Sequence, residues 1–86
     1  MKIDGQFAIF DDGSFVDLQE IASGRIVVKS RISGVSTTYE YCMVLIFRGG
    51  GTYEISRWHE KGKKEIEAMI ETILEEMKKR KAFSLG

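Results

Sequence analysis

The side chains with the greatest capacity for chemistry are the single cysteine and the single histidine, Cys42 and His59. A thiol becomes a good nucleophile when a nearby histidine or a helix N-terminus lowers its pKa, and His59 lies just before a predicted helix. A Cys42–His59 pair would therefore suit nucleophilic catalysis. Cys42 also belongs to the apolar run at residues 42–47, however, where a free cysteine commonly behaves as a small buried hydrophobe. We favour this core interpretation, so the sequence predicts no catalytic residue.

The segment around His59 is the strongest candidate for contact with a ligand or a partner. Arg57, Trp58 and His59 are consecutive, and Trp and Arg are enriched at the energetic centres of interfaces. His59 by itself could act as a general base or as a pH-sensitive group. With Arg48, these residues define an alternative function, the binding of a nucleotide or another anion. The simpler interpretation is a surface junction in which Trp58 covers one end of the core.

Two further clusters could hold a phosphate or a cation, but both fit a structural turn better. The glycines at residues 49–51 precede a predicted strand, whereas a phosphate-binding loop precedes a helix and usually carries a lysine. Asp11, Asp12 and Asp17 could bind calcium or magnesium, but their spacing does not match an EF-hand loop. A hairpin turn and a polar turn explain the two clusters. We therefore expect no metal and no other cofactor.

Basic residues on one predicted strand raise the question of nucleic-acid binding. Arg25, Lys29 and Arg31 share a strand face, and with Tyr39 and Tyr41 of the next strand they could contact single-stranded nucleic acid by charge and stacking. The alternative is an edge strand that its basic side chains protect from aggregation. Lys plus Arg and Asp plus Glu each number 13, so the formal net charge is zero. That balance argues against general nucleic-acid binding and against a polybasic membrane anchor.

Turn residues divide the first two-thirds of the chain into short extended runs. Proline is absent and nine glycines supply the turns. The expected strands cover residues 6–10, 15–18, 25–32, 38–48 and 52–58. We interpret them as an antiparallel meander of about five strands within residues 3–58, followed by a helix. The sequence therefore predicts an α+β fold in one domain, residues 1–86.

The run at residues 38–48 indicates how this sheet is covered. One face would carry Tyr39, Tyr41, Met43, Leu45 and Phe47, and the other Cys42, Val44 and Ile46. Both faces are apolar at residues 42–47, which is typical of a central strand that is covered on two sides. One helix covers only one face. The second cover must be a curl of the sheet or another copy of the chain.

Apolar residues near the C-terminus recur with the period of an amphipathic helix. The predicted helix spans residues 62–81 with Gly62 as its N-cap, and a tail follows at residues 82–86. Acidic residues precede basic ones along the helix, an order that complements its dipole. The predicted core of sheet and helix consists of Val44, Leu45, Ile46, Phe47, Ile66, Met69, Ile70, Ile73, Leu74 and Met77.

The order of these signals resembles a group of small bacterial and phage-encoded proteins in which about five strands are closed by a C-terminal helix, like a shortened pleckstrin-homology domain. The flagellar FlbD-type proteins are an example. The matching stretches are GSFVDL at residues 13–18 with Ile21, VLIFRGG at 44–50 with YEI at 53–55, and the helix at 65–77. The long hairpin at residues 25–41 has no counterpart in the shortest members. The resemblance implies a cytoplasmic, non-enzymatic accessory or interaction protein and transfers no site residues.

Size and hydropathy lead to the same function class. A domain of 86 residues buries only about 60–65% of its unfolded surface, so self-association or a protein partner would add stability. The longest apolar run is six residues, against the roughly 20 that cross a bilayer, and no apolar secretion signal is present. We therefore expect a cytoplasmic interaction module, homo-oligomeric and of phage or mobile-element origin, whose candidate contact residues are Tyr39, Tyr41, Arg48, Arg57, Trp58 and His59.

Overall fold

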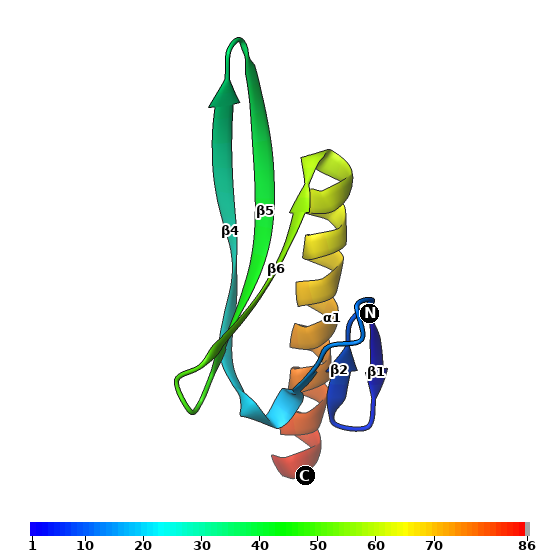
Figure 1. The fold of residues 1–86 in the computed structure, drawn as a ribbon. Helices are drawn as coiled ribbons and strands as arrows, with labels where there is room; N and C mark the ends of the chain where they lie inside the picture. The colour runs from blue at the N-terminus through cyan, green and yellow to red at the C-terminus, as the bar shows by residue number, and fades with distance from the viewer. Residues whose placement is uncertain (86) are drawn as a thin grey trace.

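Within residues 1–85, six strands form two antiparallel sheets, and one long helix packs against both (Figure 1). The computed structural model describes the backbone of residues 1–85 and the side chains of residues 1–80. The N-terminal sheet contains β1 (Lys2–Asp4), β2 (Phe7–Ile9) and β3 (Phe15–Asp17), in that order. After the short helix η1 (Leu18–Glu20), the long sheet contains β4 (Ile21–Ser33), β5 (Ser36–Phe47) and β6 (Thr52–Trp58). The helix α1 (His59–Leu85) follows β6 directly. The α+β class with a C-terminal helix is confirmed.

The prediction of one meander of about five strands is wrong, because the chain changes direction at η1. Asp17 caps η1 by accepting a hydrogen bond from the Gln19 amide at 2.9 Å, and Leu18 is buried. β4 therefore starts a new sheet instead of pairing with β3. The additional strand, β1, pairs with β2 across a turn in which Gly5 adopts a φ of +59°. Its three residues are too short a run for the period-two pattern to reveal.

β5 is the central strand of the long sheet, as the sequence predicted. On the inner face, which faces α1, Met43 and Leu45 are buried against the helix residues Ile66 and Ile73. On the opposite, outer face Cys42 is buried and Val44 and Ile46 are half-buried. Within residues 1–85 no helix or second sheet covers the outer face. The expected second cover is therefore not supplied by the described part of the chain.

The helix begins at His59 rather than at residue 62 and includes residues 82–85 of the predicted tail. His59 has a φ of +64°, which turns the chain from strand to helix without a loop. Gly62 is consequently not the N-cap but lies in the first turn, pressed against Arg57. The side chains of residues 81–86 and the backbone of Gly86 lie outside the described residues. Among residues 1–85 no helix has both the length and the apolar character needed to cross a membrane.

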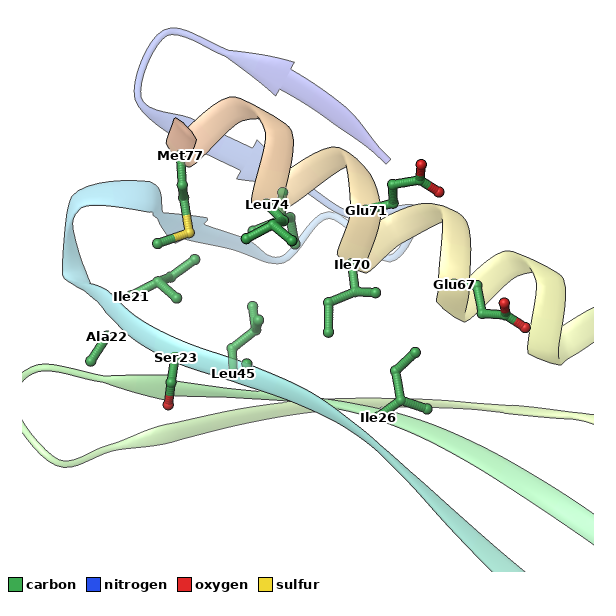
Figure 2. A pocket seen from close by; sticks show the side chains of 12 residues that line it. Ile21, Ala22, Ser23, Ile26, Leu45, Glu67, Ile70, Glu71, Leu74 and Met77 are labelled. Atoms are coloured by element: carbon green, nitrogen blue, oxygen red, sulfur yellow. The ribbon is translucent and has the colours of Figure 1, made fainter. Parts of the chain in front are cut away.

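The predicted helix stripe is buried only in part. Ile66 and Ile73 are buried, and Met69, Ile70 and Met77 are half-buried against the core. Leu74, which was predicted to lie in the core, is 51% exposed. The helix lies mainly over β5 and β6, and its Leu74 side meets an open space beside β4 (Figure 2).

β4 and β5 continue beyond the body of the protein as a two-stranded arm, residues 30–39 (Figure 1). β6 ends at Trp58, which lies opposite Glu40, and Glu40 in turn lies opposite Lys29. The arm therefore has neither a third strand nor the helix beside it. It closes in a two-residue turn between Ser33 and Ser36, and it gives the molecule its 55 × 25 × 23 Å shape.

Candidate functional site

Exposed apolar side chains concentrate on the arm and on the neighbouring part of β4 and α1. Within residues 1–80, six of the nine large exposed hydrophobic side chains belong to this region, and together we call them the arm patch: Ile26, Val28, Ile32, Val35, Tyr39 and Leu74. The register places Ile26 opposite the buried Met43, so the even-numbered residues of β4 lie on the inner face. Ile32 is 78% exposed although it is an aliphatic side chain. Exposed apolar side chains that are concentrated in one region in this way are typical of an interaction site.

An apolar groove separates the start of β4 from α1. Its volume is about 450 Å³, and Figure 2 shows its side chains arranged around an open space. The sheet contributes Ile21, Ile26 and Leu45, and the helix contributes Ile70, Leu74 and Met77. Gly24 packs closely against the apolar wall of the groove, because a Cβ atom there would lie 3.1 Å from Leu45 Cδ2 and 3.7 Å from Ile70 Cδ1. The groove therefore offers an apolar floor beside the edge of the sheet.

The groove continues toward the C-terminal part of α1 into a more polar hollow. The two hollows share Ile21, Ala22, Leu74 and Met77. Glu67 and Glu71 line the first hollow, whereas Arg48, Lys78 and Arg80 line the second. The combined surface is thus apolar in the middle and charged at both ends, as interfaces between proteins commonly are.

The edge of β4 beside the groove is open. β4 pairs with β5 on one side, and no strand among residues 1–85 pairs with its other side. Such an edge presents unpaired backbone N–H and C=O groups that another strand can bind. The groove, the arm and this edge adjoin one another, so one extended segment could contact all three.

The basic residues of β4 occupy the outer face, away from the arm patch. Lys29 forms an ion pair with Glu54, with Nζ 3.3 Å from Oε1, and this carboxylate raises the pKa of the exposed Lys29. The Arg31 guanidinium lies 5.5 Å from the centre of the Trp58 ring. Tyr39 and Tyr41 lie on the inner face, and Tyr41 is buried. The nucleic-acid hypothesis required these tyrosines beside the basic residues, whereas the structure separates the two sets.

The predicted anion-binding residues do not form one site. Arg48 follows the end of β5 beside the β5–β6 turn, whereas Arg57 lies opposite Tyr41 in the middle of the sheet. Six strand positions separate Tyr41 from Phe47, so about 20 Å lies between the two arginine positions. Arg57 is already engaged, with its Nε 3.3 Å from Glu65 Oε2 and a side-chain N–H donating to the Ser56 carbonyl at 2.8 Å.

Trp58 and His59 also diverge from Arg57. Trp58 belongs to the outer face, where it contacts Arg31, and Arg57 belongs to the inner face. His59 is exposed at the first residue of α1. The three side chains are neighbours in the sequence, but successive residues of a strand point to opposite faces. The structure therefore does not bring them together.

Cys42 lies buried on the outer face beside the Lys29–Glu54 ion pair. Burial raises the pKa of the Cys42 thiol, and a hydrogen bond involving Glu54 raises it further. A thiol of this kind is protonated and weakly nucleophilic at neutral pH. Cys42 lies opposite Ser56 of β6, whereas His59 lies three residues beyond Ser56 and is exposed. These positions support the core interpretation of Cys42.

The aspartate and glycine clusters have structural partners. Asp11 binds the N-terminal amine at 3.0 Å, Asp12 accepts hydrogen bonds from the amide and the hydroxyl of Ser14, and Asp17 caps η1. The Ser14 hydrogen bonds lower the pKa of the exposed Asp12. Within the described residues no three metal-binding side chains gather. Residues 49–51 form the β5–β6 turn, in which the Phe47 amide donates to the Gly51 carbonyl at 2.8 Å.

Sequence reasoning missed the arm and the groove. The even-numbered positions Ile26, Val28 and Ile32 are the signal in the sequence that could have revealed an apolar face on β4. The sequence pattern could not show that this face of β4 stays uncovered. β6 ends and α1 begins before the arm, and the position of the helix over the sheet depends on contacts between distant residues.

Comparison of the chain with protein-family models, with curated proteins and with solved structures gives no match. The resemblance to pleckstrin-homology-like and FlbD-type proteins therefore stays a prediction. The function must be argued from the arm, the edge of β4 and the groove.

Proposed function

We propose that this protein is a small cytoplasmic interaction module that binds another polypeptide chain along the edge of β4 and the inner face of the arm. The observation that carries the proposal is the coincidence of the arm patch with an unpaired strand edge. An extended segment that joins such an edge gains main-chain hydrogen bonds, and its alternate side chains enter adjoining pockets. The groove beside Gly24 supplies such a pocket.

The composition of this surface supports a protein partner more than a small anion or a nucleic acid. Its inner face carries Ile26, Val28 and Ile32, which would lose their water contact on binding another apolar surface. Two of the three basic side chains on the outer face already have partners, Lys29 with Glu54 and Arg31 with Trp58. The anion-binding alternative finds less support, because Arg48 and Arg57 lie about 20 Å apart along the sheet.

Site-specific photo-cross-linking tests this function. A benzophenone amino acid replaces Val35, which is fully exposed at the tip of the arm, and the protein is irradiated in its native cells. We expect covalent adducts with a polypeptide, either this chain itself or another protein, identified by mass spectrometry. The same probe at Phe15, an exposed aromatic position on the N-terminal sheet, serves as the control. If position 35 yields no protein adduct beyond those of position 15, the proposed function is wrong.

A further inference from the structure

We infer that the chain bound by the arm is a second copy of this protein, and that β4 pairs with β4 of that copy in an antiparallel manner about a two-fold axis at Val28. This inference rests on the proposed function and specifies its partner. Two-fold symmetric dimers use the same surface on both copies, so the surface must complement itself. The arm and the groove meet this requirement, since one is an uncovered apolar projection and the other an unfilled apolar hollow.

The strand register explains how the two features meet. With the axis at Val28, residues at equal distances before and after Val28 lie opposite each other, so Ile32 of one copy faces Gly24 of the other. Ser30 similarly faces Ile26. All of these are even-numbered residues of the inner face, so the sheet continues across both copies with the two helices on the same side. The axis pairs residues 23–33 of the two copies, a stretch of the open β4 edge that follows the register shift between Ile21 and Ser23.

Gly24 is the point at which the arm of the second copy would reach the groove. Because Gly24 lines the groove together with Leu45 and Ile70, the Ile32 side chain of the second copy would enter the groove beside these apolar side chains. Ser33 of the second copy then lies opposite Ser23, so the tip of its arm reaches toward the place where the two hollows join. This symmetric contact would cover Ile26, Val28 and Ile32 of the arm patch together with the groove that Leu74 lines.

The outer face of such a dimer would bring together Arg25 of one copy and Arg31 of the other. Like charges opposite each other on neighbouring strands destabilise the pairing modestly. Salt screens this repulsion but does not weaken apolar contacts. The dissociation constant of the dimer should therefore stay unchanged or decrease as the salt concentration increases. A dissociation constant that increases with the salt concentration would overturn the inference.

Disulfide cross-linking tests directly which residues of the two β4 strands lie opposite each other. Three variants carry one cysteine each at Val27, Val28 or Lys29, in a Cys42→Ala background because Val27 lies opposite Cys42 within the chain. Residues directly opposite in an antiparallel pair have Cα atoms about 4.5–5.5 Å apart, within the range a disulfide bridges. Val28→Cys should give covalent dimers about ten times faster than the other two, since only residue 28 faces itself. Fastest cross-linking at residue 27 or 29, or none at all three, overturns the inference.

Substitutions in the arm and in the groove test the contact between them. Ile32→Asp and Leu74→Asp place a carboxylate on residues that are exposed in the single chain, so both variants should fold, as circular dichroism can verify. By sedimentation equilibrium each should raise the dissociation constant about 100-fold, because symmetry introduces the charge twice. Phe15→Asp makes the same change at an exposed position outside the contact and should leave the dissociation constant unchanged.

The outcomes separate this inference from the proposed function. A wild-type protein that stays monomeric at its solubility limit overturns the inference, yet a photo-adduct between position 35 and a different protein would still support the proposed function. A dimer that both Ile32→Asp and Leu74→Asp leave intact uses another surface and also overturns the inference. A dimer that both variants weaken and Phe15→Asp does not supports it.

Discussion

Gly62 determines how closely the start of α1 approaches the end of β6. A Cβ atom at this position would lie 2.7 Å from the Cβ and 2.8 Å from the backbone carbonyl carbon of Arg57. Neither atom belongs to the end of a flexible side chain, so the backbone itself would have to move. The glycine is therefore required by packing, although it lies in the first turn of a helix, where alanine has the higher propensity.

Gly62→Ala should accordingly destabilise the protein by about 1–3 kcal/mol, the usual cost of overpacking. Urea unfolding monitored by circular dichroism measures the free energy of unfolding. Gly49→Ala is the control, because a Cβ atom at Gly49 meets nothing within 4 Å and its φ is not positive. A Gly62→Ala variant as stable as Gly49→Ala would contradict the close packing of Gly62 against Arg57.

Cys42 should make the stability depend on pH in the alkaline range. The folded protein raises the pKa of this thiol above its ordinary value of 9.0, chiefly through burial. The unfolded chain therefore ionises first, so the thiol's contribution is complete below about pH 9 and is lost as pH rises through the folded pKa. Urea unfolding at a series of alkaline pH values should show this loss, and Cys42→Ala should reduce it. If the Cys42→Ala variant loses as much stability at alkaline pH as the wild type, the loss is due to other titratable groups.

At the scale of elements, α1 is held to the long sheet by one side of its apolar stripe. Ile73 is 2% exposed and Leu74 is 51% exposed, although both residues fit the same helical pattern. The burial of Ile73 against the sheet stabilises the fold of the single chain. Leu74 lines the groove, and its exposed apolar surface is available for an intermolecular contact.

Ile73→Ala and Leu74→Ala therefore form a matched pair. At concentrations where the protein is monomeric, Ile73→Ala should lower the free energy of unfolding by about 2–5 kcal/mol, the typical cost of a cavity in a core. Leu74→Ala should lower it by less than about 1 kcal/mol, because little packing is lost. Denaturant unfolding of both variants provides the comparison, and equal losses would contradict the different burial of the two side chains.

At the scale of the whole molecule, the arm should be separable from the body. The helix and β6 leave residues 30–39 without cover, so the arm contributes little to the shared core. The N-terminal sheet, in contrast, is attached to that core. Phe10 stacks on Tyr53 with ring centroids 5.0 Å apart, and the Arg80 guanidinium donates a hydrogen bond to the Gly5 carbonyl.

Removal of the arm tests this division. Lys29 and Glu40 lie opposite each other, so residues 30–39 can be replaced by an Asn-Gly turn that fits a two-residue hairpin. The shortened protein should keep its cooperative unfolding and lose self-association, as thermal melting and light scattering can show. A control that replaces only Gly34 by Asn, which tolerates the positive φ at this position, keeps the whole arm patch, so it should still associate. Loss of cooperative unfolding in the shortened protein would place the arm within the core.

Much of the architecture follows from local sequence patterns. The stripe that contains Ile66 and Ile73 predicts the helix, and the doubly apolar run at residues 42–47 predicts the central strand. Periodicity reports these features because burial on one side of an element leaves its spacing in the sequence. The turn at residues 49–51 is similarly local, since glycine accommodates its positive φ at Gly50.

Long-range arrangement decided the rest. No local pattern distinguishes Leu74 from Ile73, places Arg48 far from Arg57, or ends the first sheet at η1. Each of these depends on which strands pair and where the helix lies over the sheet, and those choices are made by contacts between residues distant in the chain. The sequence by itself thus determined the long helix, the central strand and the hairpin turn that follows it. Only the tertiary structure decided which apolar faces the chain covers and which it leaves exposed, because that depends on contacts between distant residues.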